Sequence, residues 1–113
     1  MNHEVYFYLK DPKQIDRAVF LHILPDIAVL NRNQDYIAMI CDDEDQSEIR
    51  TAYIREVKHM RFSDILNSDL CLHYLEDCRT KAGLLAYLRE VNETFDERQV
   101  IALIWFDNIG PVQ

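Results

Sequence analysis

The chain has 113 residues, of which 49% are hydrophobic, and it contains only two Gly and three Pro. This composition is typical of a single globular domain over residues 1–113 and excludes an intrinsically disordered chain. The formal net charge of −8 argues against direct binding to nucleic acid or to an anionic membrane surface, because both repel an acidic protein. No apolar run approaches the roughly 20 residues that span a bilayer.

The N-terminal residues and the cysteines bear on location. Residues 1–10 lack the basic region, apolar core and small-residue cleavage site of a secretory signal. Three Cys, an odd number without regular spacing, do not form a disulfide framework. Both features predict a cytoplasmic protein.

In chain order, the first predicted element is a strand over residues 4–9, EVYFYL, which is rich in aromatic residues. The next segment, DPKQIDRAVFLHIL, predicts a helix with Asp11 as N-cap, Pro12 at the first helical position and Pro25 as its end. One face of that helix would carry Ile15, Val19, His22 and Ile23.

Two short apolar runs follow, at 27–30 and 36–41, around the polar turn 31–35, and they predict a hairpin. Residues 48–60 are ambiguous, because their apolar residues fit one face of a helix while AYIREVK fits the alternation of a strand. Periodicity alone does not decide between the two.

The second half predicts two helices and a strand. One helix begins at Ser68 and runs to Cys78, and a second is capped by Thr80 and runs to Val91. The unbroken apolar run QVIALIWF is typical of a strand that is buried on both faces. Together the elements predict an α+β domain with a mixed or antiparallel sheet and helices packed on it.

The densest charge in the chain is the stretch CDDEDQSE, residues 41–48. A Ca²⁺-binding loop needs acids at alternate positions, Gly at the sixth and Glu at the twelfth. No register that begins at Asp42, Asp43 or Asp45 supplies the Gly. The remaining interpretations are a solvated loop and a docking site for a basic partner.

The cysteines and histidines do not form a recognisable metal or catalytic motif. Cys71, His73 and Cys78 give C-x-H-x4-C, which lacks the paired CxxC of zinc sites. We therefore expect them to pack in the interior, and we expect no metal or other cofactor and no enzymatic activity. Some of Tyr6, Tyr8 and Tyr53 are expected to be half-exposed, which would suit an interface.

The acids form three patches that the basic segments 49–61 and 79–89 separate. If these patches lie on one side of the fold, they present a row of carboxylates that a basic DNA-binding surface could meet in place of phosphates. The candidate partner-binding residues are Asp42, Asp43, Glu44, Asp45, Glu48, Asp64, Asp69, Glu76, Asp77, Glu90, Glu93, Asp96 and Glu97.

With its patches DDEDQSE, LED and ETFDE, this small acidic chain resembles the DNA-mimic proteins of bacteria, in particular the neisserial type that binds the histone-like protein HU. The resemblance covers length and acidity, since DNA mimics share no motif. It implies a monomeric protein with α and β elements that occupies the DNA-binding face of a nucleoid protein. Its functional residues would be surface acids without a catalytic role.

Three other function classes stay open. The same electrostatics suit an immunity-type inhibitor that plugs the basic active-site cleft of a nuclease toxin. An enzyme that uses Cys71 or a pair of acids would need a thiol activated by its surroundings. A bare structural subunit would need none of these features.

Overall fold

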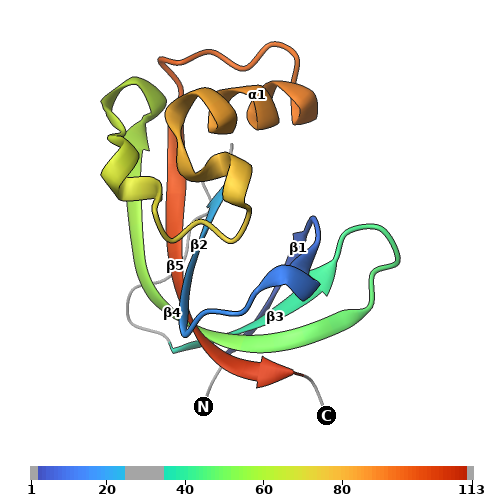
Figure 1. Cartoon of the computed structure of the whole chain (residues 1–113). Helices are drawn as coiled ribbons and strands as arrows, with labels where there is room; N and C mark the ends of the chain where they lie inside the picture. The colour runs from blue at the N-terminus through green and yellow to red at the C-terminus, as the bar shows by residue number, and fades with distance from the viewer. Residues whose placement is uncertain (1–2, 25–34, 112–113) are drawn as a thin grey trace.

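The structure is a computed structural model that describes residues 3–24 and 35–111. A five-stranded sheet with the order β1-β3-β4-β5-β2 forms its centre (Figure 1). β1 and β3 are parallel, and the other three neighbouring pairs are antiparallel, so the sheet is mixed. The strands are β1 (His3–Leu9), β2 (Val19–Leu24), β3 (Tyr36–Asp42), β4 (Glu48–Arg61) and β5 (Val100–Pro111).

Helical structure is sparse in the described residues. They contain one α-helix, α1 (Lys81–Val91). Four short 3₁₀ segments accompany it: η1 (Pro12–Gln14), η2 (Phe62–Asp64), η3 (Asn67–Leu70) and η4 (Glu76–Arg79). The prediction of α and β elements is therefore confirmed only coarsely, because the fold is dominated by the sheet.

The two longest strands bend the sheet. β4 has 14 residues and β5 has 12, and their register shifts between Thr51 and Ala52 and again between Ile54 and Glu56. Such bulges insert an unpaired residue and make a strand turn. In Figure 1 one half of the curved sheet carries α1, and the other half, with β1 and β3, turns away from the helix. A cleft lies between η1 on one side and η4 and α1 on the other.

The core consists of two clusters on opposite faces of β5. Leu103 packs with α1 residues Leu84 and Leu88 in the first cluster. Its neighbours along the strand, Ile104 and Phe106, pack in the second cluster inside the bent sheet. The interior strand β5 is thus buried on both faces, as its apolar run predicts.

Several local predictions are confirmed. β1 and β3 match the strands predicted at 4–9 and 36–41. α1 begins directly after Thr80, whose Oγ1 accepts a hydrogen bond from the Gly83 N–H at 3.2 Å. This bond satisfies one of the free N–H groups of the first turn.

The helix predicted over residues 11–24 is wrong. Only η1 is helical, Asp11 has a left-handed backbone with φ 51° and makes no capping bond, and residues 19–24 form β2. In β2, Phe20 lies opposite Phe106 and stacks on it with ring centroids 5.0 Å apart. Pairing with a strand far along the chain therefore outweighed a local helical pattern.

The helix predicted over residues 68–78 is also wrong. η3 and η4 lie at its ends, and between them the chain runs beside β2. The Leu21 N–H donates to the Leu72 carbonyl at 2.8 Å, and the Tyr74 N–H donates to the Leu21 carbonyl at 3.2 Å. The edge of β2 thus takes up backbone groups that a helix would have paired internally.

The structure also decides the ambiguous segment at 48–60, which is the strand β4, and joins it to β3 by a turn at 43–47. The strand predicted at 27–30, residues 31–34 of the predicted turn and the stop at Pro25 lie outside the described residues. Among the described residues, no helix is both long and apolar enough to cross a membrane.

Candidate functional site

The acidic stretch at 42–48 forms the tip of the β3–β4 hairpin, and some of its carboxylates hold the turn together. The Asp42 carboxylate accepts a hydrogen bond from the Glu44 N–H at 2.9 Å. The Asp45 carboxylate accepts from the Ser47 N–H at 2.9 Å and from the Ser47 hydroxyl at 2.6 Å, and these bonds lower the pKa of Asp45. Short side chains that bind nearby N–H groups are typical of turns.

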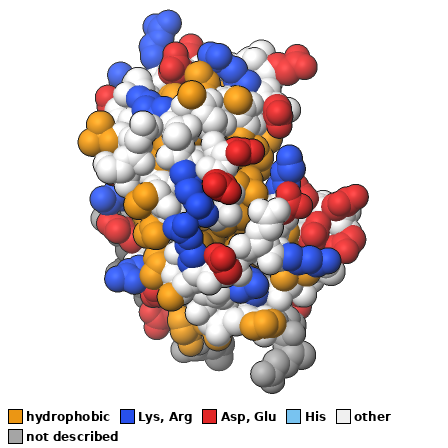
Figure 2. Space-filling model, viewed as in Figure 1, with side chains coloured by type: hydrophobic (Ala, Val, Ile, Leu, Met, Phe, Trp, Pro, Cys, Tyr) orange, Lys and Arg blue, Asp and Glu red, His pale blue; other side chains and the backbone are white. Residues whose placement is uncertain are grey.

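The hairpin tip also protrudes into solvent. Residues 43–48 are all exposed. Figure 2 shows a dense group of acidic side chains at the right edge, where the β3–β4 hairpin lies in Figure 1. The solvated loop that the sequence predicts is therefore present, and its carboxylates face outward beside the rest of the sheet.

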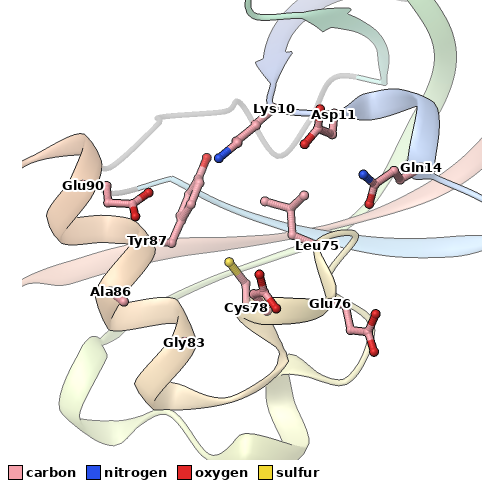
Figure 3. Close-up of a pocket in the computed structure, with 11 residues that line it drawn as sticks. Lys10, Asp11, Gln14, Leu75, Glu76, Cys78, Gly83, Ala86, Tyr87 and Glu90 are labelled. Carbon is pink, nitrogen blue, oxygen red and sulfur yellow. The ribbon is translucent and has the colours of Figure 1, made fainter.

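Beside the hairpin lies a cleft of about 590 Å³. Its walls come from η1 and the residues before it on one side and from η4 and α1 on the other (Figure 3). This volume is within the range of ligand-binding sites in proteins. The lining residues are Lys10, Asp11, Gln14, Leu75, Glu76, Asp77, Cys78, Gly83, Ala86, Tyr87 and Glu90.

The cleft brings together acids that are far apart in the sequence. Glu76 and Asp77 come from the second acidic patch, and Glu90 comes from the third. Asp11 adds a carboxylate that the sequence analysis left out, and Lys10 is the one cation among the described lining residues. Four carboxylates against one ammonium make the cleft strongly acidic.

The hairpin tip, which holds the first acidic patch, adjoins this cleft. The Asp43 N–H donates to the Leu9 carbonyl at 3.0 Å, directly before the cleft residue Lys10. Burial and then several neighbours, Asp43 and Glu90 among them, raise the pKa of Tyr87 in the cleft wall. Members of all three acidic patches therefore meet around one opening.

The pKa of the Cys78 thiol depends on its burial and on the charged residues of the cleft. Cys78 is 1% exposed, and in Figure 3 its sulfur points into the space below Tyr87 and Lys10. Burial, and after it the carboxylate of Asp77, raises the pKa of Cys78 to about 11, while Lys10 acts in the opposite direction and Glu90 raises it further. The acids outweigh the cation there, and the thiol is protonated near neutral pH.

An unsatisfied hydroxyl lies behind the cleft wall. Tyr74 is 4% exposed, and its hydroxyl makes no hydrogen bond of good geometry within the described residues. The Tyr87 hydroxyl, the Lys10 backbone and the Cys78 thiol lie close enough to affect the pKa of Tyr74, which burial raises. All three neighbours line the cleft, so the Tyr74 hydroxyl lies next to the cleft wall.

Two predicted site residues lie away from the cleft, on η2 and η3. Asp64 is exposed at the end of η2. Asp69 is half-buried and accepts a hydrogen bond from the Leu66 N–H at 2.9 Å, which caps η3. Because Asp69 caps η3, its position can be explained without a role in binding a partner protein.

The last acids of the third patch line a second, more open hollow of about 800 Å³ between α1 and β5. Glu93, Asp96 and Glu97 share it with three cations, Lys81, Arg89 and Arg98, and Asp96 forms an ion pair with Arg98 at 3.7 Å. This hollow is electrically balanced, in contrast to the cleft.

The mimic hypothesis needs the cations of the basic segments 49–61 and 79–89 to lie away from the acids, and none of these cations lines the cleft. Arg55 pairs with Asp107 at 3.1 Å, Lys58 lies over the Trp105 ring, and Arg79 donates to the His73 carbonyl at 2.9 Å. Arg55 and Lys58 therefore contact other residues of the sheet, and Arg79, the last residue of η4, binds a backbone carbonyl.

Three tyrosines form an exposed face on the outside of the sheet. Tyr6, Tyr8 and Tyr53 are 47%, 49% and 50% exposed. Sheet register places Tyr6 beside Met39 and Tyr53 beside Ile37, and both β3 residues are half-buried. The predicted half-exposure is confirmed, and aromatic residues of this kind are enriched in interfaces.

The prediction that Cys71, His73 and Cys78 pack in the interior is confirmed for His73 and Cys78 and is wrong for Cys71, which is exposed. Cys41 and Cys78 are buried and Cys71 is exposed, and each of the three is a free thiol. His73 is buried, and its Nδ1 accepts a hydrogen bond from the Leu75 N–H at 3.0 Å. In the part of the chain that the structure describes, no group of three or more His, Cys, Asp or Glu could hold a metal ion.

Sequence reasoning missed four polar residues of the cleft: Lys10, Asp11, Gln14 and Tyr87. Lys10 and Asp11 follow β1 directly, and a polar pair at the end of a strand is a weak signal of a site rim. Tyr87 is the one half-buried aromatic residue on α1. Nothing in the local sequence relates η1 to α1.

No protein-family model, curated protein or solved structure in the comparisons matches this chain.

Proposed function

We propose that this protein binds a basic, DNA-binding protein through the acids around the cleft and the adjoining hairpin tip, and that it competes with DNA for that partner. The observation that carries the proposal is the meeting of Asp43, Asp77 and Glu90, one from each acidic patch, around a single opening. The partner class, a histone-like protein such as HU, comes from the resemblance to DNA mimics.

Electrostatics explains why such a surface would compete with DNA. A protein surface that binds DNA carries Lys and Arg spaced to neutralise phosphates. Exposed carboxylates make charge-assisted contacts with the same side chains, and each contact is weak by itself. The hairpin and the cleft supply several carboxylates side by side, so their contacts can act together.

The arrangement of cations supports the same function. Lys58 and Arg55 lie on the sheet, and Arg89 and Arg98 lie in the balanced hollow. A basic partner that approaches the cleft therefore meets Lys10 as the one cation among the described lining residues. Like-charge repulsion would be stronger at the other surfaces.

The test is a competition experiment with an HU-like protein on labelled duplex DNA. We expect this protein to release the DNA at roughly 50 mM salt, where charge contacts are strong, and to lose that activity steeply as the salt rises. If no complex with the HU-like protein or another basic DNA-binding protein forms at that salt concentration, the proposal is wrong.

Two triple variants with equal net charge separate a specific surface from overall acidity. One neutralises the cleft through Glu76→Gln, Asp77→Asn and Glu90→Gln. The matched control neutralises acids elsewhere through Asp64→Asn, Glu93→Gln and Glu97→Gln. We expect about tenfold weaker competition from the cleft variant, given three contacts of about 0.5 kcal/mol each, and little change from the control. An equal loss of competition in the two variants would show that the effect depends on net charge alone.

A second candidate, an immunity-type inhibitor of a nuclease toxin, is favoured by the protruding hairpin tip. Residues 43–48 are exposed and acidic, so they could enter a concave basic active site that DNA normally fills. The experiment for it is rescue of cells that express a candidate toxin encoded beside this gene. Loss of rescue on changing Asp43 and Glu44 to amides would support this function over the first.

A further inference from the structure

We infer that the cleft between η1 and α1 is a socket for one guanidinium group, an arginine side chain of the basic partner. The inference rests on the proposed function and specifies which group of the partner this site takes. It combines the acidic lining with the Tyr74 hydroxyl, which is buried, makes no hydrogen bond of good geometry among the described residues and lies next to the lining residues Tyr87, Lys10 and Cys78.

The lining suits a flat cation. Carboxylates from two elements, Asp77 on η4 and Glu90 on α1, line the cleft and both raise the pKa of the Cys78 thiol, so they lie near the same part of the cleft. A guanidinium offers several N–H donors in one plane and can bond to carboxylates on more than one side, whereas an ammonium acts as a point charge. The ring of Tyr87, half-buried in the wall, provides a surface for stacking.

Lys10 occupies this space in the free protein. In Figure 3 its ammonium group points toward the Tyr87 hydroxyl, from the wall opposite α1. Lys10 is exposed and has no salt bridge within 4.0 Å among the described residues, so its side chain is held weakly. An incoming guanidinium would displace it, take over the carboxylates and bring a donor to the Tyr74 hydroxyl.

The Tyr74 hydroxyl explains why the site is more than a group of surface acids. A buried hydroxyl without a partner is costly, so a ligand that supplies the missing bond gains from it. Removing that hydroxyl should therefore leave the fold at least as stable while it weakens the ligand. A hydroxyl with a purely structural role would show the opposite pattern.

The experiment follows backbone amide shifts of the full-length protein during titration with the pentapeptide Gly-Gly-Arg-Gly-Gly, blocked at both ends. We expect saturable shifts at Gln14, Cys78 and Tyr87, and no such shifts with the neutral isostere in which citrulline replaces Arg. The lysine pentapeptide should bind several-fold more weakly. A similar response to the citrulline or the lysine peptide would overturn the inference.

Four variants sharpen the test. Tyr74→Phe should weaken the arginine peptide about three- to tenfold with an unchanged or higher unfolding midpoint, and Glu90→Gln should weaken it about as much. Lys10→Met should tighten it about two- to fivefold by removing the competing cation, whereas Lys13→Gln, outside the cleft, should not. Unchanged binding in both Tyr74→Phe and Lys10→Met would overturn the inference.

Two further comparisons complete the test. The first asks whether the guanidinium comes from a protein side chain or from a free small molecule, and the second tests the socket separately from the proposed function. Binding of free agmatine without binding of the arginine peptide would overturn a side chain as the occupant. If the wild type displaces DNA from the HU-like protein but the arginine peptide does not bind in the cleft, the inference of a guanidinium socket is wrong and the proposed function stands. If the cleft takes the peptide but no basic partner is bound, the socket stands and the proposed function fails.

Discussion

The imidazole of His73 stacks on the ring of Tyr74, with ring centroids 5.0 Å apart and planes 18° apart. The ring of His22 also lies near Tyr74, with ring centroids 5.8 Å apart and planes 59° apart. His22 and His73 are 6% and 1% exposed, and the His22 Nδ1 has no hydrogen bond among the described residues. Two imidazoles and a phenol thus lie buried behind the cleft.

This buried cluster predicts acid sensitivity. Burial lowers the pKa of His22 to about 4; burial, with His22 and Arg79 as weaker causes, lowers the pKa of His73 to about 3. Unfolded His titrates near 6.5, so below that pH the unfolded chain binds protons that the folded chain refuses. Stability is therefore full above about pH 6.5 and falls as the pH drops toward 4.

We expect a loss of about 2 kcal/mol per buried histidine between pH 7 and pH 5, before the carboxylates begin to titrate. Urea unfolding at a series of pH values measures it. His22→Leu should remove one histidine's share of the slope, and the exposed His59→Gln should leave the slope unchanged. Identical slopes in the wild type and His22→Leu would contradict this prediction.

At Gly83, substitution by alanine is expected to change the stability in the direction opposite to the one that helix propensity predicts. A Cβ at this position would overlap the backbone carbonyl oxygen of Asp77, because η4 and α1 approach closely there. In an open helix, Gly→Ala stabilises by about 1 kcal/mol. We expect Gly83→Ala instead to destabilise the protein by about 1–3 kcal/mol, as overpacking does. A higher thermal midpoint in this variant would show that η4 moves aside freely.

The hairpin acids allow charge to be separated from turn structure. Asn can accept the same hydrogen bonds from Ser47 as Asp45 does, whereas Ala cannot. We expect Asp45→Asn to keep the turn and Asp45→Ala to loosen it, with several-fold faster amide exchange at Ser47 in the Ala variant. Partner binding should weaken in both. Equal exchange rates in the two variants would mean that these bonds do not hold the turn.

The thiols provide a test of the enzyme alternative. Burial raises the pKa of Cys41 and brings that of Cys78 to about 11, while Cys71 is exposed. With iodoacetamide near pH 7.5 we expect Cys71 to be alkylated on the order of a hundredfold faster than the other two. Cys71→Ser should remove the fast reaction, and denaturant should expose all three thiols. Rapid labelling of Cys78 in the folded protein would point to an activated thiol in the cleft.

Part of this fold follows from sequence alone. The apolar run at 100–106 is long enough to be recognised as a doubly buried strand, and Thr80 marks the start of α1 by local capping chemistry. The turn at 43–47 and the half-exposed tyrosines follow from side-chain type. Each of these features has a signal in residue type or in a pattern within a short stretch of chain.

Only the tertiary structure decided the rest. Residues 19–24 became a strand because Phe20 meets Phe106, and residues 71–74 did not form a helix because Leu72 and Tyr74 bond to Leu21. The cleft depends on η1 lying opposite α1 across a bend in β4 and β5. Charge along the sequence gave three acidic patches, but pairing between distant segments determined which of their carboxylates share one opening. Such contacts leave no periodicity in the sequence, because their partners are separated by dozens of residues.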